Sequence, residues 1–202
     1  MSGGNVMTGL RAQKKRRTKQ DLATAAVDLL LSEGRDGATV ASIAARAGVS
    51  TRTFHNYFAA REDAFLHFVE EIVAEWIREV ESAPADETPF ETLHRTIRDL
   101  CNRPGGDSTA VANLMTITEH ALAGMGMEGR ARVVGMFAGV VDIIVARSDG
   151  ELSRFRAATL VHVALTLAGH VLDVAAQPGL AEGRDVNSLL DDAFDYVGKG
   201  LA

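Results

Sequence analysis

The amino-acid sequence predicts an all-α protein of about nine helices, in which a short helix-turn-helix unit precedes a larger helical part. Apolar residues recur at intervals of three and four through much of the 202 residues, and this is the period of an amphipathic helix. Residues 84–202 contain no stretch with the period of two that a half-buried strand requires. Capping and breaking residues, such as Pro178-Gly179, separate the periodic stretches.

Residues 1–13 show no helical periodicity and are predicted to form a flexible arm. The basic run Lys14-Lys15-Arg16-Arg17-Thr18-Lys19 follows. Thr18 and Asp21 resemble a capping box, so we expect a helix to start there and to end near Gly34. The apolar side of this helix comprises Leu22, Ala26, Leu29 and Leu30. Cations beside a helix N-terminus suit contact with phosphates or a minor groove, although such a run is also typical of a solvated tail.

The helix-turn-helix unit is predicted between residues 39 and 61. The apolar face of its first helix comprises Val40, Ile43, Ala44 and Ala47. Gly48 stands where the chain must reverse and where a left-handed residue is needed. Ser50 can then cap the second helix, which is expected to bury Phe54 together with Tyr57 or Phe58.

The outward face of this second helix carries small and hydrogen-bonding residues. They are Thr51, Arg52, Thr53, His55 and Asn56. A short helix with such residues at its exposed start is what recognition in a major groove requires. The alternative is an ordinary helical hairpin that has a polar face and no nucleic-acid partner.

Charge is distributed unevenly along the chain. The formal net charge is −6, yet the first 63 residues carry ten Lys or Arg against six Asp or Glu. The remaining residues carry 11 basic against 21 acidic side chains. A local basic patch attracts phosphates whatever the total charge, so the N-terminal part is the candidate for nucleic-acid binding.

A long helix is predicted to start at Arg61 and to connect the N-terminal part with the rest of the chain. Glu62 and Asp63 lie in its first turn, where acidic side chains interact favourably with the helix dipole. Its apolar stripe comprises Phe65, Phe68, Val69, Ile72, Trp76, Ile77 and Val80. Pro84 and its neighbours end the helix.

These N-terminal features resemble the DNA-binding domain of the tetracycline-repressor (TetR) family of bacterial regulators. The resemblance rests on Gly34, Thr39, Ala47-Gly48-Val49-Ser50, Thr53-Phe54-His55-Asn56-Tyr57-Phe58 and Arg61-Glu62-Asp63-Ala64-Phe65. It implies an N-terminal three-helix DNA-binding domain over residues 14–60, a connector helix over 61–83, and a helical ligand-binding and dimerisation domain over 84–202.

The resemblance also implies double-stranded DNA, as a palindromic operator, for a partner. Arg52, Thr53 and Asn56 would lie nearest the bases. The DNA backbone would be held by Thr39, Ser50, Thr51, His55, Tyr57 and Arg61. The basic run would add phosphate contacts from Lys14, Arg16, Arg17 and Lys19.

Two positions depart from the family's usual pattern. His55 replaces the usual tyrosine, and a phosphate contact through it would depend on pH; a purely structural role for His55 is an equal alternative. Arg61 replaces the usual lysine, keeps the positive charge and can grip a phosphate with two N–H groups.

Helices alone are predicted for residues 84–202. Thr88-Pro89-Phe90-Glu91 combines a cap, a proline at the first helical position and a glutamate that closes a capping box. Further helices are expected over about residues 111–123, 128–147, 151–176 and 185–201, with a break at 124–127. The helix over 128–147 is apolar nearly all round and should be buried on most sides.

The last two helices are candidates for half of a four-helix bundle across a two-fold axis. The resemblance favours such a homodimer, while periodicity alone equally fits two helices that close the chain's own core. The candidate interface residues are Phe155, Ala158, Val161, Leu165, Leu172, Leu190, Phe194 and Val197.

An unknown small-molecule effector is the third partner that the resemblance implies. Candidate pocket residues are Trp76, His94, Met115, His120, Met125, Phe137, His162 and His170. Methionines and aromatic rings suit pockets for varied apolar ligands, although each of these residues taken singly is more typical of a protein core. The spacing of the histidines fits no compact metal-binding motif, so no metal is expected.

No phosphate-binding loop, nucleophile elbow or paired-acid motif is present, so we predict no catalytic residues and no cofactor. A helical enzyme and a DNA-binding protein without an effector remain the alternatives. No apolar run approaches the length of a membrane span, and no signal segment is found at the N-terminus. A single cysteine, Cys101, excludes an internal disulfide, and a cytoplasmic location is therefore expected.

Overall fold

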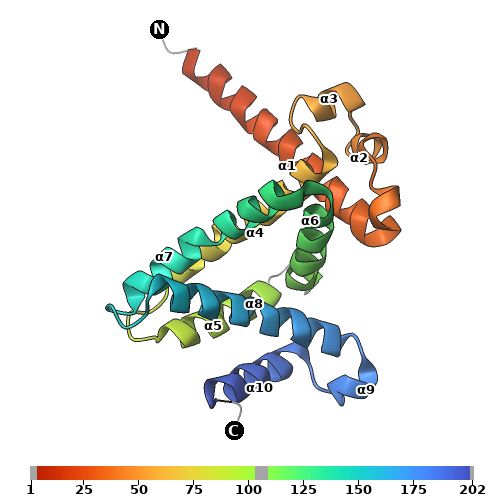
Figure 1. Ribbon diagram of the computed structural model, residues 1–202. Helices are drawn as coiled ribbons and strands as arrows, with labels where there is room; N and C mark the ends of the chain where they lie inside the picture. Colours follow the sequence, from red (N-terminus) through yellow and green to blue (C-terminus); the bar gives the residue numbers. More distant parts are fainter. Residues whose placement is uncertain (1–3, 103–108, 201–202) are drawn as a thin grey trace. The chain divides into compact units, whose positions relative to one another are not determined.

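The computed structural model describes residues 4–102 and 109–200, and these residues form helices without any strand (Figure 1). The helices are α1 (Gly4–Gly37), α2 (Val40–Arg46), α3 (Thr51–His55), α4 (Arg61–Glu81), α5 (Pro89–Cys101), α6 (Thr109–Met136), α7 (Ala138–Arg147), α8 (Arg154–Ala175), α9 (Pro178–Ala181) and α10 (Val186–Gly198). The chain divides into two compact units, which are Met1–Glu71 with Ile117–Arg130, and Ile72–Thr116 with Ala131–Ala202. Helices α4 and α6 each pass from one unit into the other.

In the N-terminal unit, α1 starts much earlier than the sequence predicted. The expected helix start at Thr18 is wrong, because α1 is continuous from Gly4 and encloses the basic run. Alanine, glutamine, lysine and arginine all favour helix, and no breaking residue separates Leu10 from Thr18. The predicted end is confirmed, since Gly34 leaves the helix with a φ of +72°.

The helix-turn-helix follows the predicted local geometry closely. Thr39 caps α2 in a capping box with Ser42. Gly48 has a φ of +68°, the left-handed conformation expected for the reversal. Oγ of Ser50 accepts a hydrogen bond of 3.1 Å from the backbone N–H of Thr53 and caps α3.

Helix α4 begins at Arg61 as predicted and supplies apolar side chains to both units. Phe65 and Val69 are buried in the N-terminal unit, and Trp76 and Val80 are buried in the C-terminal unit. The remaining residues of the predicted stripe, Phe68, Ile72 and Ile77, are half-buried. The start of α4 is capped by Asp63, whose Oδ2 accepts a 3.0 Å hydrogen bond from the N–H of Ala60.

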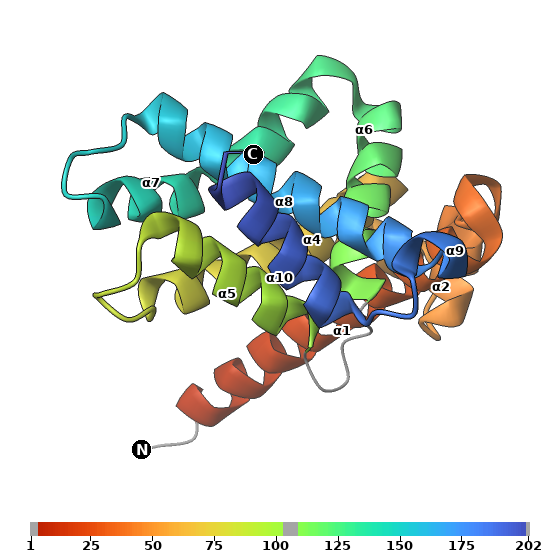
Figure 2. The ribbon, with the colours of Figure 1, turned by 90° about the horizontal axis from the view of Figure 1, so that it is seen from below.

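The core of the C-terminal unit lies between α5, α7, α8 and α10. In Figure 2, α10 runs beside α8 and α5, as the contacts between these three helices require. The predicted capping box at Thr88 and Glu91 is present and starts α5. The largest fully buried side chains of this core are Trp76, Leu93, Ile97, Ile144, Leu190 and Phe194.

Three details of the C-terminal half differ from the prediction. The single helix expected over residues 128–147 is interrupted at Phe137, where α6 ends and α7 begins. Val134 in α6 is 73% exposed, so the expectation of burial on most sides is wrong there. The short helix α9 was not predicted. The break expected at 124–127 is confirmed as a kink at Gly126, whose φ is +60°.

Helix α8 is long and apolar enough to cross a bilayer by length and composition, which the sequence analysis did not expect. Within the described residues it is the single helix of this kind, and 33% of its most apolar stretch is buried in the chain's own fold. One side of α8 contacts α5, α7 and α10. Much of its apolar character therefore lies outside the core that the chain itself provides.

Candidate nucleic-acid interface

Helix α3 is held firmly from beneath and presents polar side chains outward. Phe54 is fully buried and Phe58, after the helix, is 5% exposed, with ring centroids 5.7 Å apart. Tyr57 is half-buried, so the second buried aromatic residue is Phe58. The exposed side chains of this region are Thr51, Arg52, His55 and Asn56.

Contacts within the unit hold several of the side chains at the surface of α3 in place. The hydroxyls of Ser50 and Thr53 lie 2.9 Å apart, and Ser50 also caps the helix, so both side chains are held at the start of α3. The ring of His55 makes an edge contact with Phe54, with centroids 5.5 Å apart. Because the backbone of α3 is already ordered, its exposed donors can enter a major groove with little further loss of conformational entropy.

The basic run of α1 separates into exposed residues and one anchored residue. Lys14, Arg16 and Arg17 are exposed. Lys19 is half-buried, with its Nζ 5.5 Å from the centroid of the Phe58 ring and 3.4 Å from Nδ1 of His67. Lys19 thus connects α1 to the end of the helix-turn-helix, while Lys14, Arg16 and Arg17 remain available to phosphates.

Thr39 and Arg61 are both engaged within the unit. The hydroxyl of Thr39 accepts from the N–H of Ser42 at 3.1 Å, although the residue itself is exposed. Nη1 of Arg61 donates to the carbonyl oxygens of Arg35 at 2.6 Å and Ala38 at 3.2 Å. Sequence reasoning missed this role of Arg61, because the two acceptors are backbone atoms more than twenty positions away.

Comparisons with known proteins bear on this interface. Residues 22–67 match the model of the bacterial regulatory proteins of the tetR family. The chain is 30% identical over 150 residues to the HTH-type transcriptional regulator TcmR of Streptomyces glaucescens, which covers 71% of this chain and 66% of TcmR. This chain belongs to the TetR family.

Solved structures agree with a TetR-family fold over nearly the whole chain. The fatty acid degradation regulator FadR of Bacillus halodurans has a TM-score of 0.68 at 18% identity, covering 91% of this chain and 96% of that one. FadR of Bacillus subtilis, solved with stearoyl-CoA, has a TM-score of 0.66 at 19% identity, covering 90% and 98%. These structures share the all-helical fold of the chain. The family model and the relative TcmR make the protein a TetR-family transcriptional regulator.

In the C-terminal unit of this TetR-family regulator, some of the candidate pocket residues lie together and others do not. The rings of Trp76 and Phe137 meet at 6.4 Å in an edge contact. The ring of His94 stacks on Phe194 at 4.5 Å, and its Nε2 lies 3.0 Å from Oδ1 of Asp191. Trp76 and Phe194 belong to the core of the C-terminal unit and Phe137 packs against it, whereas His94 is half-buried.

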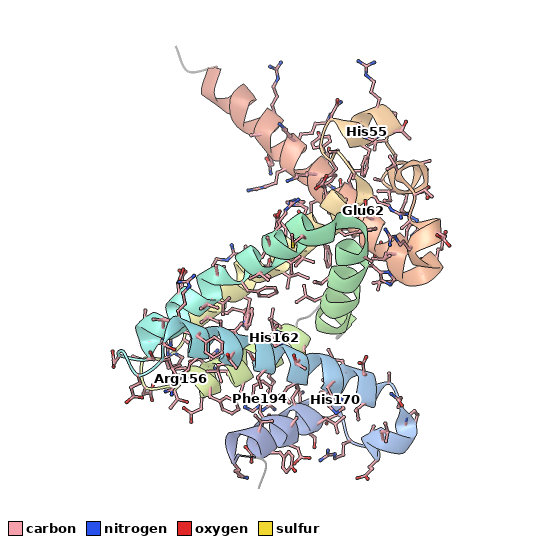
Figure 3. All side chains as sticks on the ribbon, in the orientation of Figure 1. His55, Glu62, Arg156, His162, His170 and Phe194 are labelled. Atoms are coloured by element: carbon pink, nitrogen blue, oxygen red, sulfur yellow. The ribbon has the colours of Figure 1, made fainter. Side chains whose placement is uncertain are left out.

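The remaining pocket candidates lie elsewhere. His162 and His170 are exposed on α8 (Figure 3), and His170 lines a surface groove between α8 and α10. His120 is half-buried on α6. The side chains of Met115 and Met125 lie outside the part that the structure describes.

Some of the candidate dimer residues are buried within the single chain and others are exposed. Val161, Leu165, Leu172, Leu190 and Phe194 are at most 8% exposed, because the core of the single chain covers them. Phe155 is 79% exposed, and Ala158 and Val197 are also accessible.

An apolar groove of about 310 Å³ runs between α8, α9 and α10 of the TetR-family body. Its lining residues include Leu167, His170, Val174, Leu180, Tyr196 and Val197. Leu180 is 60% exposed and Tyr196 is 55% exposed. Large apolar side chains in one contiguous surface indicate a site of interaction.

The described part of the chain holds neither a cluster of metal-ligating side chains nor a reactive thiol. Within the described ranges, no group of three or more His, Cys, Asp or Glu side chains gathers as metal ligands would. Cys101 is buried, and desolvation raises the pKa of its thiol to about 11. A thiol of this kind is a poor nucleophile at neutral pH.

Proposed function

We propose that this TetR-family regulator is a homodimeric transcriptional repressor that a small, mostly apolar molecule releases from a palindromic operator. The observation that carries the proposal is the construction of α3. Arg52 and Asn56 are exposed on a helix that Ser50 caps and Phe54 anchors. In this proposal they contact bases with Thr53, while Thr51 and His55 contact the backbone.

The electrostatics of the N-terminal residues support DNA as the partner. Lys14, Arg16 and Arg17 extend as exposed cations along α1, ahead of the helix-turn-helix. Such cations raise the affinity for DNA of almost any sequence, and this contribution falls steeply as the salt concentration rises. Operator binding in the cytoplasm would thus combine phosphate contacts from α1 with base contacts from α3.

Homodimerisation through α8 and α10 is supported by their uncovered apolar side. Phe155, Leu180 and Tyr196 are large, apolar and mostly exposed. The groove between α8 and α10 is lined mostly by apolar side chains, with the ion pair of Arg184 and Asp192 among them. A second copy of the same surface would cover them across a two-fold axis. Two α3 helices related by that axis would fit two successive major grooves of a palindrome.

The continuity of α4 supports the proposal that an effector bound in the C-terminal unit controls DNA binding. This helix begins beside the helix-turn-helix at Arg61 and contributes Trp76 and Val80 to the core of the C-terminal unit. A ligand that prefers one packing of that core would shift α4 and the spacing of the two recognition helices. Because B. subtilis FadR was solved with stearoyl-CoA, long-chain acyl-CoA is the first class of ligand to test.

Selection of bound DNA from a random pool, with the purified full chain, tests the proposal. We expect an enriched inverted repeat whose half-sites lie about one helical turn apart. Enrichment of no sequence at low salt would contradict the DNA-binding function. A thermal-shift screen with apolar metabolites and acyl-CoA then tests the effector; stabilisation by none of them would favour a regulator controlled by a protein partner.

A further inference from the structure

The guanidinium of Arg61 is held by three acceptors inside the N-terminal unit. Its Nη1 donates to the carbonyl oxygens of Arg35 and Ala38, and its Nε donates to Oε1 of Glu62 at 3.1 Å. The side chain is 23% exposed. Both hydrogens of Nη1 and the hydrogen of Nε are therefore committed, and every two-pronged grip on a phosphate needs one of these nitrogens.

The two carbonyl groups follow the kink of α1 at Gly34, where the chain turns toward α2. The chain leaves α1 at Gly34, and Ala38 is fully buried. The carbonyl oxygen of Gly37, in the same turn, accepts from Oγ of Ser42 at 2.6 Å. Carbonyl groups after a helix end have no partner in that helix, so Arg61 supplies donors that the turn would otherwise lack.

Glu62 fixes the orientation of the guanidinium. Its carboxylate lies 3.1 Å from Nε of Arg61 and 3.7 Å from Nη2 of Arg35, and its side chain is only 16% exposed (Figure 3). Two arginines on one shielded carboxylate hold the first turn of α4 and the end of α1 in one arrangement.

We infer that Arg61 is a positioning residue that locks the first turn of α4 to the α1–α2 turn, and that this lock, rather than a two-pronged phosphate contact, is its contribution to operator binding. Since α2 contacts both α1 and α3, this lock sets where α3 lies relative to the start of the connector helix. The inference deepens the proposed function and rests on it where operator binding is concerned.

Operator affinity measured over a range of salt concentrations distinguishes positioning from phosphate contact. We compare the full chain with Arg61→Gln and with Arg17→Gln, the same change at an exposed arginine of α1. Arg61→Gln is expected to weaken binding about tenfold at fixed salt without changing the slope of log K against log salt. Arg17→Gln is expected to lower the slope by about 1. A slope lowered by about 1 in Arg61→Gln would overturn the inference.

Arg61→Lys provides a second variant that retains the charge. One ammonium group cannot reproduce the planar fork that holds two carbonyls and Glu62 together. We therefore expect affinity to stay about threefold or more below that of the unchanged chain. Full restoration by lysine would point to a simple phosphate contact and would overturn the positioning role.

Hydrogen exchange on the DNA-free protein separates this inference from the proposed function. The amides of Ala38 and Thr39, which bond within the turn, should exchange faster in Arg61→Gln and at the original rate in Arg17→Gln. If these amides exchange faster in Arg61→Gln while no operator is selected, the proposed function is wrong but the positioning role of Arg61 is supported. If an operator is selected and neither exchange nor affinity changes in Arg61→Gln, the lock is refuted.

Discussion

Nε1 of Trp76 donates a hydrogen bond of 2.9 Å to Oγ1 of Thr96, and both side chains are buried in the C-terminal unit. Oγ1 of Thr96 in turn donates to the carbonyl oxygen of Thr92 at 2.8 Å. This chain of hydrogen bonds joins α4 to α5 at the level of the core. A buried indole N–H without such a partner would cost its full desolvation energy.

Thr96→Val should therefore destabilise the fold by about 1–3 kcal/mol, since it keeps the shape of the side chain and removes the acceptor of Trp76. Urea unfolding followed by the emission of the single tryptophan measures this. Thr159→Val, at an exposed position of α8 whose hydroxyl bonds only within its helix, is the matched control. Equal stability losses in both variants would mean that the bond to Trp76 contributes nothing.

Cys101 should react slowly with thiol reagents in the native protein. Its pKa of about 11 leaves a thiolate fraction at pH 8 that is roughly a hundredfold or more below that of an exposed cysteine. Labelling with an aromatic disulfide at pH 8, with and without urea, gives the two rates. Native labelling as fast as that of the unfolded chain would show that Cys101 is accessible.

Glu87 should make stability depend on acid pH. Arg95 binds both carboxylate oxygens of Glu87, at 2.6 and 3.1 Å, and this hydrogen bonding lowers the pKa of Glu87 below 4.5. The unfolded chain binds the proton at higher pH than the folded one, so the stabilisation is complete above the unfolded pKa and is lost as pH falls through the folded pKa.

The test compares the unfolding free energies of the unchanged chain and Glu87→Gln between pH 7 and pH 3. Because the pair is partly exposed, we expect a difference below about 1 kcal/mol at pH 7 that vanishes in acid. Glu151→Gln, at an exposed position, controls for the loss of one negative charge. A difference that grows as pH falls would contradict the sign of this linkage.

Phe155→Glu and Tyr196→Glu should convert the proposed dimer into monomers, because each places a charge on the uncovered apolar side of α8 and α10. Light scattering coupled to size exclusion measures the mass directly. Leu31→Glu, an equally drastic change at a partly exposed leucine of α1, should leave the mass unchanged. A dimer that survives both substitutions would place the interface elsewhere.

Sequence reasoning succeeded where the determinant of structure is local. Gly48 and the caps at Ser50 and Thr88 act on backbone groups within three residues, so the residue types alone specify them. The family signature likewise lies in short contiguous motifs around α2 and α3. The start of α1 was misplaced because a plausible cap at Thr18 was preferred to uninterrupted helix-forming residues before it.

Sequence reasoning could not decide non-local packing. The periodicity of α8 is the same whether Val161 faces the chain's own core or another copy, and only the fold shows that it faces the core. The acceptors of Arg61 are the backbone carbonyl groups of residues 35 and 38. Every residue has such a carbonyl group, so the residue types do not show which ones accept. Such assignments depend on which elements meet, and one sequence does not reveal that.

The most direct test of the account is the base preference of Arg52→Ala at fixed salt. If α3 is the recognition helix, loss of this exposed guanidinium should weaken operator binding by about tenfold or more and relax the choice of base at one position in each half-site. Arg46→Ala, at an exposed arginine of α2 paired with Glu33, should retain the preference. Unchanged affinity and unchanged base preference in Arg52→Ala would show that α3 does not read the operator.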